Sequence, residues 1–318
     1  MKPVPVVFHT GPLEVHTYGI GLAITFCFAY LYFARRLRNH GYRTEWMAGM
    51  FVWVIVAAIV GARAMSVLSN LGYYGHNPGQ IIAIWHGGLS SFGGLILAVP
   101  TGIILTRRRC PELATMRGLD LVAPVLAAAW AMGRLLGPQL MVRGGGHPTS
   151  QWFGMYYATQ AGKRLPVPIF QAFEDFAIFV VLILLERRLE HWPDGARRVG
   201  YPAGAVLGTG MVLWGIERAA DQRLWLAYPN NLGSELVQVA GVALAVGGLV
   251  VLVTARRRWR AWLSAGAPGG RLDPQGADSA GATLGDGDPV LSGETGGLAP
   301  VASPGAGATD AGREAHGP

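Results

Sequence analysis

Seven apolar runs, each about 20 residues long, dominate the chain up to residue 255. A helix needs a run of this length to cross the hydrocarbon core of a bilayer, where the backbone must satisfy its own hydrogen bonds. The runs cover residues 13–34, 45–68, 87–106, 119–138, 167–186, 199–218 and 235–255. The sequence therefore predicts an all-α fold: a polytopic membrane protein with about seven transmembrane helices.

The composition agrees with a membrane protein. Of the 318 residues, 51% are hydrophobic and 14% are charged, and the mean hydropathy is +0.32. An ordinary soluble domain is less apolar and carries more charge. The first run lacks the basic start and the A-x-A cleavage site of a signal peptide. We therefore expect this run to remain in the protein as a membrane helix.

The basic residues predict the orientation in the membrane. They cluster after the first, third, fifth and seventh runs, as ARRLRNHGYR, RRRCPELATMRG, RRLEHWPDGARRVG and ARRRWR. The segment after the second run, SNLGYYGHNPGQIIAIWH, contains neither Lys nor Arg. Loops rich in Lys and Arg stay in the cytoplasm. The pattern therefore predicts an N-terminus outside and a cytoplasmic C-terminus.

Residues 264–318 differ in composition from the rest of the chain. They are rich in Gly, Ala, Pro and Asp, lack apolar periodicity, and contain seven acidic residues against two arginines. Such a segment buries too little apolar surface to fold. We expect a transmembrane domain over residues 1–263 and a disordered cytoplasmic tail over 264–318. The basic excess of the domain fits contact with the lipid bilayer, and no feature indicates a nucleic-acid partner.

Polar residues near the predicted outer ends of the runs are candidates for a functional site, because burying such groups in lipid costs about 2.5–3.5 kcal/mol each. They are His16, Tyr18, Arg63, His86, Arg134, Gln171, Glu174, Asp175 and Arg218. The predicted cytoplasmic halves hold only Asp120. This asymmetry predicts a polar site that opens to the outer leaflet.

Three arginines among these candidates indicate the class of ligand. The guanidinium group binds phosphate through two parallel hydrogen bonds and stays charged when partly buried. Arg63, Arg134 and Arg218 therefore favour an anionic phospholipid headgroup. The stretch IWHGGLSSFGGL adds small residues four apart, a spacing that lets membrane helices approach closely.

Each candidate also has a purely structural interpretation. Arginines near span ends often extend their charged groups to the interface, which would explain Arg63 and Arg218 without a ligand. Tyr18 would serve equally well as an aromatic anchor at the interface. His86 would be a solvated or packing residue, and Glu174 would only pair with a neighbouring arginine.

Eight motifs in order along the chain resemble the prolipoprotein diacylglyceryl transferase family of bacterial inner membranes, over about residues 8–258. They are FHTGPLEVHTYGIG, VGAR, WHGGLSSFGGL, LDLVAP, GRLLG, GGGHPTSQWFG, FQAFE and WGIER. They resemble the family's G-P-x-x-x-H-x-Y-G, G-[GA]-R, W-x-G-G-M-S-F-H-G-G-L, D-x-x-A-P, G-R-x-G-N, G-R-P-T-x-x-P-W-G, Q-L-Y-E and Y-G-x-x-R.

The resemblance implies an activity. The family transfers a diacylglyceryl group from phosphatidylglycerol to the lipobox cysteine of a prolipoprotein, forming a thioether and releasing glycerol 1-phosphate. It implies no cofactor and no metal, and partners that comprise phosphatidylglycerol, prolipoprotein signal peptides and the bilayer of the bacterial inner membrane. It assigns catalysis to Arg134, Arg218, Tyr18 and Glu174, and phosphatidylglycerol binding to Arg134, Gly145, Arg63, His16 and His86.

The chain departs from the family pattern at several polar positions. Phe92 stands where the family has a histidine, no asparagine follows Gly137, and LMV occupies residues 140–142 where the family has N-x-E. Gln222 stands where a carboxylate is expected four residues after Arg218.

Three functions are compatible with these residues and with their departures from the family pattern. The first is an active diacylglyceryl transferase. The second is a weak or inactive paralogue that binds anionic phospholipid or lipobox peptides. The third, a small-solute transporter, is disfavoured because no polar path leads to the predicted cytoplasmic side.

Overall fold

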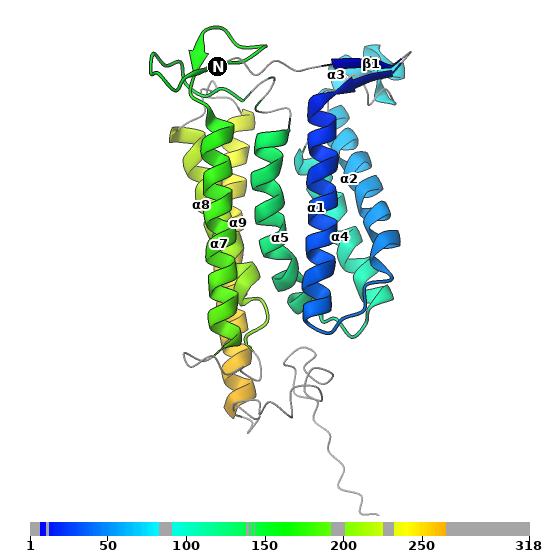
Figure 1. The fold of residues 1–318 in the computed structure, drawn as a ribbon, viewed down its shortest axis with the longest axis vertical. Helices are drawn as coiled ribbons and strands as arrows, with labels where there is room; N and C mark the ends of the chain where they lie inside the picture. Colours follow the sequence, from blue (N-terminus) through cyan, green and yellow to red (C-terminus); the bar gives the residue numbers. More distant parts are fainter. Residues whose placement is uncertain are drawn as a thin grey trace, which may run out of the picture. The chain divides into compact units, whose positions relative to one another are not determined.

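The chain is mostly helical (Figure 1). The computed structural model describes residues 7–10, 13–82, 91–137, 140, 142, 144–191, 201–224 and 232–264. Seven long helices lie within these ranges: α1 (Thr17–Asn39), α2 (Met47–Ser69), α4 (Ser91–Arg109), α5 (Thr115–Leu136), α7 (Val167–Glu190), α8 (Ala205–Leu224) and α9 (Leu232–Ser264). Each of the seven predicted runs overlaps one of them.

Five of these helices are long and apolar enough to cross a membrane: α1, α2, α5, α7 and α9. The other two carry charge: α4 ends in three arginines, and α8 holds Glu217, Arg218 and Asp221 in its C-terminal half. The protein is therefore a helical, multi-pass membrane protein.

Two helices extend beyond the predicted runs. α8 ends at Leu224 rather than at residue 218, and α9 continues to Ser264 rather than stopping at residue 255. Polar residues such as Arg and Gln are good helix formers, so the loss of apolarity marks the end of a run but not the end of a helix. The predicted tail, residues 264–318, lies outside the described residues apart from Ser264.

Short elements supplement the long helices. A helix α3 (Leu71–His76) and a 3₁₀ turn η1 (Pro78–Ile81) follow α2. Strands β1 (Val7–Thr10) and β2 (Leu13–His16) form one antiparallel hairpin, in which Val7 pairs with His16. Strands β3 (Met155–Tyr156) and β4 (Lys163–Arg164) form another. The all-α prediction missed both hairpins because such short strands leave no alternating pattern in the sequence.

Glycines set the helix crossings. Where α2 packs on α4, a Cβ atom added to Gly93 would lie 2.2 Å from the Gly61 carbonyl oxygen, and one added to Gly61 would lie 2.2 Å from the Gly93 oxygen. α8 and α9 meet in the same way at Gly215 and Gly241. Only glycine allows two helix backbones to approach this closely. The second glycine pair of IWHGGLSSFGGL thus serves packing, while Gly87 lies outside the described residues.

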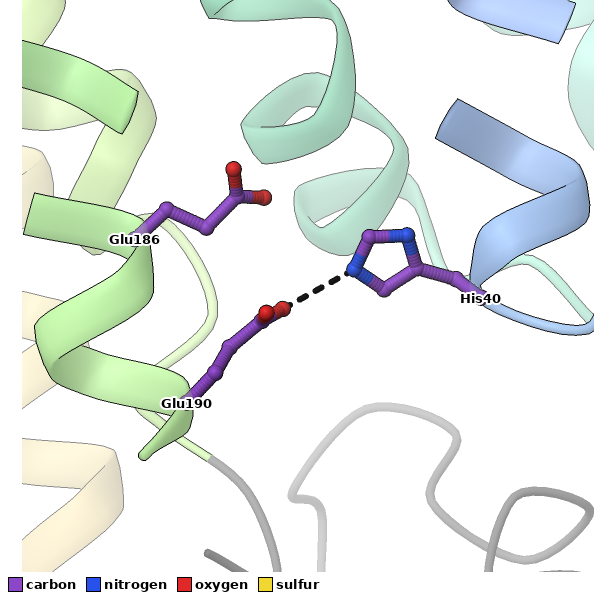
Figure 2. Close-up of side chains that lie close together, drawn as sticks. All are labelled: His40, Glu186 and Glu190. Atoms are coloured by element: carbon purple, nitrogen blue, oxygen red, sulfur yellow. Dashed lines mark hydrogen bonds and ion pairs between the residues drawn. The ribbon is translucent and has the colours of Figure 1, made fainter. Parts of the chain in front are cut away.

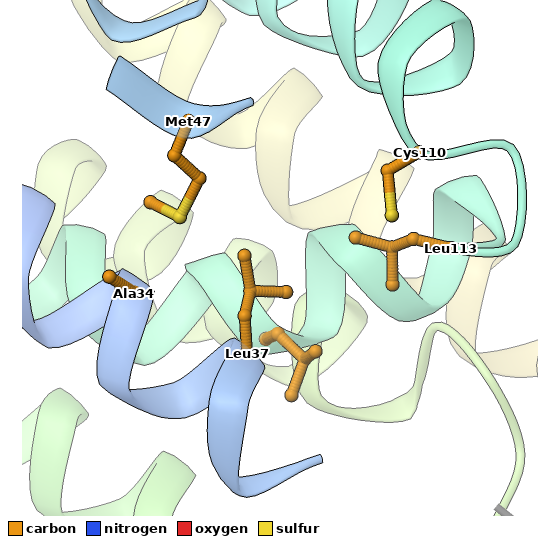
Figure 3. Close-up of a cluster of buried hydrophobic side chains, with 6 residues drawn as sticks. Ala34, Leu37, Met47, Cys110 and Leu113 are labelled. Carbon is orange, nitrogen blue, oxygen red and sulfur yellow. The ribbon is translucent and has the colours of Figure 1, made fainter. Parts of the chain in front are cut away.

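Two apolar clusters hold the helices together. The first joins α1, α2 and the turn between α4 and α5 through Ala34, Leu37, Met47, Cys110, Leu113 and Leu121 (Figure 3). The second joins α5, α7 and the start of α8 through Ala123, Ile178, Leu182, Tyr201 and Val206. Asp120 fixes the start of α8, because its carboxylate accepts hydrogen bonds from the backbone N–H groups of Gly204 and Leu207, both 2.7 Å long.

Candidate functional site

Seven polar side chains gather where α5, α7 and α8 pack together. On α7 and α8 they recur three and four residues apart, a spacing that places side chains on one face of a helix. We call this group the three-helix cluster: Arg134, Gln171, Glu174, Asp175, Glu217, Arg218 and Asp221. It brings together three of the predicted site residues, Arg134, Glu174 and Arg218.

Arg134 links α5 to α7. Its Nε lies 3.6 Å from Asp175 Oδ2, and the two side chains are 8% and 1% exposed. Arg218, Glu217 and Asp221 of α8 lie within electrostatic range of the same guanidinium group. Arg134 therefore presents a planar set of hydrogen-bond donors at the meeting point of three helices, which is the geometry that phosphate recognition requires.

Asp221 connects α7 with the second arginine. Gln171 Nε2 donates a 2.6 Å hydrogen bond to Asp221 Oδ2, and the same oxygen lies 3.8 Å from Arg218 Nη1. The Asp221 side chain is 1% exposed, whereas that of Arg218 is 23% exposed. Asp221 thus holds the Arg218 guanidinium group at the edge of the cluster.

Carboxylates outnumber the arginines in the cluster. One oxygen each from Glu174, Glu217 and Asp221 lie within 4.8 Å of one another. Three such oxygens have the spacing of a cation site, but Arg134 and Arg218 already supply positive charge beside them. The arrangement therefore fits proton exchange and the binding of an anion at the arginines better than a metal ion.

A tryptophan pair closes one side of the three-helix cluster. The rings of Trp130 and Trp214 meet edge to face with centroids 4.8 Å apart, one helical turn before Arg134 and Arg218 respectively. Beyond them along the helices lies the apolar cluster that contains Ile178 and Leu182. The seven polar groups of the three-helix cluster therefore lie together at one end of α5, α7 and α8.

Gly145 lies in the loop between α5 and α7, where it has a packing role. Its backbone N–H donates to Gln160 Oε1 at 2.8 Å, and its carbonyl oxygen accepts a 3.0 Å bond from Gln160 Nε2. An added Cβ would lie 2.7 Å from that Oε1 and 2.8 Å from Tyr157, so no larger residue fits. Burial in this loop raises the pKa of Tyr157 to about 12.

Arg63 lies on α2 and makes structural contacts. Its Nε donates a 2.9 Å hydrogen bond to the Ile81 carbonyl oxygen, and Nη2 donates to the Gln80 carbonyl. The guanidinium group also lies 5.3 Å from the centre of the Tyr74 ring. These contacts brace the segment that follows α2 and do not join Arg63 to the three-helix cluster.

Three predicted site residues have no described side chain. His16 belongs to β2 and Tyr18 to the first turn of α1, but only their backbone positions are described. His86 lies outside the described residues altogether, as does the side chain of Phe92.

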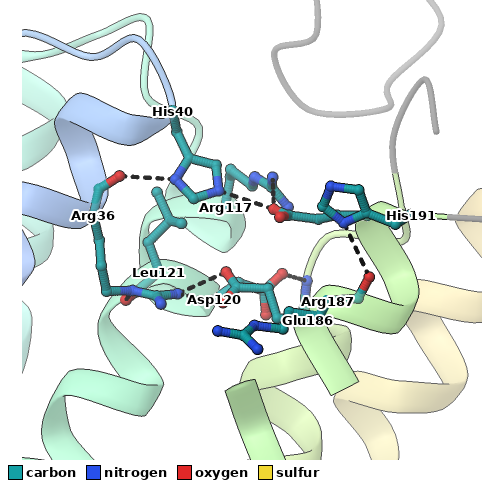
Figure 4. Close-up of polar contacts among 10 residues, drawn as sticks. Arg36, His40, Arg117, Asp120, Leu121, Glu186, Arg187 and His191 are labelled. Atoms are coloured by element: carbon teal, nitrogen blue, oxygen red, sulfur yellow. Dashed lines mark hydrogen bonds and ion pairs between the residues drawn. The ribbon is translucent and has the colours of Figure 1, made fainter. Parts of the chain in front are cut away.

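A second group of polar residues corrects one prediction from the sequence. The predicted cytoplasmic halves of the helices were expected to contain no polar candidate other than Asp120. We call this group the basal network: Arg36, His40, Arg117, Glu186 and Glu190 (Figure 4). Arg36 Nη2 donates to both Glu186 oxygens at 2.6 and 2.7 Å, and its Nε donates to the Leu121 carbonyl oxygen at 2.9 Å. The prediction was wrong because Arg36 and Glu186 stood at the ends of their runs, where charged groups usually reach water.

Glu190 completes the basal network. Its Oε1 lies 2.9 Å from His40 Nε2 (Figure 2). The same oxygen lies 3.3 Å from Arg117 Nη2. His40, Glu186 and Glu190 are close enough to ligate a cation. However, Arg36 and Arg117 neutralise the two carboxylates, so the network acts as a brace between α1, α5 and α7. Arg117 also stacks 4.0 Å from the centre of the Tyr201 ring, and burial raises the pKa of Tyr201.

Comparison with known proteins shows the family of this chain. The family model described as prolipoprotein diacylglyceryl transferase matches residues 5–254, which include every helix of the three-helix cluster. The chain belongs to this family.

Curated relatives carry the name phosphatidylglycerol–prolipoprotein diacylglyceryl transferase. The protein from Lactiplantibacillus plantarum is 29% identical over 214 residues, which cover 64% of this chain and 75% of the relative. The protein from Bacillus velezensis is 30% identical over 200 residues, or 58% of this chain and 70% of the relative. That from Bacillus licheniformis is 36% identical over 130 residues, or 41% and 47% respectively.

The structure revises one departure from the prolipoprotein diacylglyceryl transferase pattern. The carboxylate expected at residue 222 is replaced by Gln222, yet Asp221 lies 3.8 Å from Arg218. On a helix, residues three and four apart both face the reference residue. A carboxylate therefore remains beside this arginine, displaced by one position along α8.

Sequence reasoning missed Glu217 and Asp221 as site residues. The predicted sixth run ends at residue 218, before Asp221, and Glu217 lies within the motif WGIER without a predicted role. The spacing Trp214, Glu217, Arg218, Asp221 is the signal that identifies one helical face.

Proposed function

We propose that this chain transfers the diacylglyceryl group of phosphatidylglycerol to the cysteine thiol of prolipoproteins, the first step of bacterial lipoprotein maturation. The supporting observation is Arg134, a buried arginine at the junction of α5, α7 and α8, in a chain that belongs to the transferase family. The relatives' names specify this donor and this acceptor.

The proposal places the enzyme in the bacterial inner membrane. All seven long helices cross the bilayer, with the N-terminus outside and the C-terminus in the cytoplasm. The basic ends of α1, α4 and α7 then face the cytoplasm, as the positive-inside rule requires. In this orientation the three-helix cluster lies near the outer leaflet, where phosphatidylglycerol and the signal peptide meet.

The two arginines have different tasks in this proposal. Arg134 holds the phosphate of phosphatidylglycerol, because its guanidinium group lies at the junction of three helices and can bind a phosphate through two parallel hydrogen bonds. The more exposed Arg218 stabilises the leaving phosphate as its C–O bond breaks. Glu174, whose carboxylate lies within 4.8 Å of a Glu217 and an Asp221 oxygen, lines the acceptor side of the site.

The remaining predicted residues have supporting roles in this proposal. Tyr18, His16 and His86 contribute to binding of the headgroup. Gly145 shapes the loop over the site, which its close packing against Gln160 supports. For Arg63 the contacts with Gln80 and Ile81 support an indirect role, in which it positions the segment before α4.

A weak or inactive paralogue is the alternative, and it rests on Phe92 and on the missing asparagine after Gly137. The retained arginines, and Asp221 at 3.8 Å from Arg218, favour the active enzyme.

Complementation decides between the two. The full chain should restore growth and lipoprotein lipidation in a strain depleted of its own transferase, whereas Arg134→Gln should not. Well-expressed protein in the membrane that restores neither would overturn the proposal.

A further inference from the structure

We propose that the carboxylate of Glu217 accepts the proton of the cysteine thiol during transfer. This inference rests on the proposed function and adds a residue to its mechanism. A thiol must lose its proton before it attacks, because the thiolate is the nucleophile. The position of the family's histidine in S-F-H-G-G holds Phe92, which cannot take up a proton.

Glu217 differs from the other carboxylates of the three-helix cluster in its surroundings. It is 9% exposed, and neither of its oxygens accepts a hydrogen bond within the described part of the chain. Asp221 is held by Gln171. The oxygens of Asp175 likewise accept no hydrogen bond, but Asp175 lies 3.6 Å from Arg134 Nε, whereas no such ion pair is described for Glu217. A buried carboxylate without donors is costly in a fold, and within a membrane protein such groups mark functional sites.

The neighbours of Glu217 suit proton exchange. Carboxylate oxygens of Glu174 and Asp221 lie within 4.8 Å of a Glu217 oxygen. Carboxylates that share a site repel one another as anions, and a proton held between them relieves the repulsion. Uptake of the thiol proton by Glu217 would therefore relieve the repulsion among the three carboxylates.

Its place on α8 joins proton transfer to phosphate binding. Glu217 directly precedes Arg218 and lies within electrostatic range of Arg134. A thiol at Glu217 would therefore stand beside the phosphate that the two arginines hold. This proximity is what an in-line displacement at the ester carbon needs.

The step balances in atoms and charge. Glu217 takes the proton from sulfur, and the thiolate attacks the glyceryl carbon that bears the phosphate ester. The new S–C bond forms as the C–O bond breaks, and the bonding electrons leave on the phosphate oxygen of glycerol phosphate. The proton then passes from Glu217 to this leaving group, which restores the carboxylate.

The test is transfer to a lipobox peptide by the purified full chain in phosphatidylglycerol vesicles, measured between pH 6.5 and 8.5. Glu217→Gln keeps the shape but cannot take up a proton, so we expect kcat at pH 7 to fall at least about 100-fold with little change in KM for phosphatidylglycerol. Its rate should then rise about tenfold per pH unit, because only thiol that is already ionised reacts.

Two further variants separate chemistry from structure. Glu217→Asp keeps a carboxylate and should retain more activity than Glu217→Gln, with the pH profile of the unaltered chain. Glu235→Gln removes an exposed carboxylate from the first turn of α9 and should change nothing.

The inference fails if Glu217→Gln keeps the unaltered rate and pH profile, or if both Glu217 variants lose phosphatidylglycerol binding and activity to the same degree. An unaltered chain without any transfer would instead overturn the proposed function, and this inference with it.

Discussion

Asp221 Oδ2 lies 3.8 Å from Arg218 Nη1, three residues earlier on α8, and accepts a 2.6 Å hydrogen bond from Gln171 of α7. A single buried carboxylate thus fixes an arginine on its own helix and joins that helix to its neighbour. The family pattern places this carboxylate one residue later, where the chain has Gln222.

Removing this carboxylate should impair transfer. We expect Asp221→Asn to lower kcat/KM about tenfold or more, because Arg218 loses its partner and stabilises the leaving phosphate less well. The double variant Asp221→Asn, Gln222→Glu should recover part of the loss, since residue 222 also faces Arg218. Steady-state transfer in vesicles measures both. A double variant no better than the single one would show that the displaced carboxylate has no equivalent role.

The crossing of α2 and α4 should tolerate no side chain at residue 93. An added Cβ would lie 2.2 Å from the Gly61 oxygen, so Gly93→Ala should destabilise the protein by about 1–3 kcal/mol despite the better helix propensity of alanine. Gly102→Ala on the same helix is the control, because its nearest neighbour would be 3.7 Å away. Thermal unfolding in detergent compares them. Equal Tm values for the two variants would contradict the close backbone contact between Gly61 and Gly93.

The basal network should behave as a buried ion pair. Glu186→Leu leaves the Arg36 guanidinium group buried without its carboxylate and should cost about 3–5 kcal/mol, whereas the double variant Arg36→Met, Glu186→Leu should recover most of that. Denaturant unfolding provides the measurement. Glu112→Gln, which breaks the exposed pair with Arg43, should have no measurable effect. A single variant as stable as the unaltered protein would rule out this account of the brace.

Cys110 should react slowly with alkylating reagents. Burial, and next the nearby carboxylate of Glu112, raise the pKa of its thiol from 9.0 to about 11. Because the folded pKa exceeds the unfolded one, the stabilising contribution is complete below pH 9 and is lost as the pH rises towards 11. Mass spectrometry of the alkylated protein should find Cys110 modified in the unfolded chain and little modified in the folded protein at pH 7.5. Equal labelling of both would contradict the buried thiol.

The sequence predicted the helices well because apolar runs of membrane length admit few other structures. It also predicted Arg134, Glu174 and Arg218 as candidates for a site, since charged residues inside apolar runs stand out. These residues come from three separate helices, and only packing shows that they meet.

The errors have physical causes. Arg36 and Glu186 stood at the ends of apolar runs, where the sequence cannot distinguish a buried pair from two solvated charges. Asp221 lies outside the predicted run because helix α8 continues past the last apolar residue, whereas Glu217 lies inside the run but has no predicted role. The glycine of the motif VGAR meets Gly93 of a different motif, a contact between segments that neither sequence pattern reveals alone.

The central claim is that this chain transfers a diacylglyceryl group at Arg134. The direct measurement is the mass of a lipobox peptide after incubation with purified protein in phosphatidylglycerol vesicles, together with released glycerol phosphate. We expect the peptide to gain one diacylglyceryl group for each glycerol phosphate released, and Arg134→Gln to abolish both. A peptide of unchanged mass, or equal transfer by Arg134→Gln, would contradict the account.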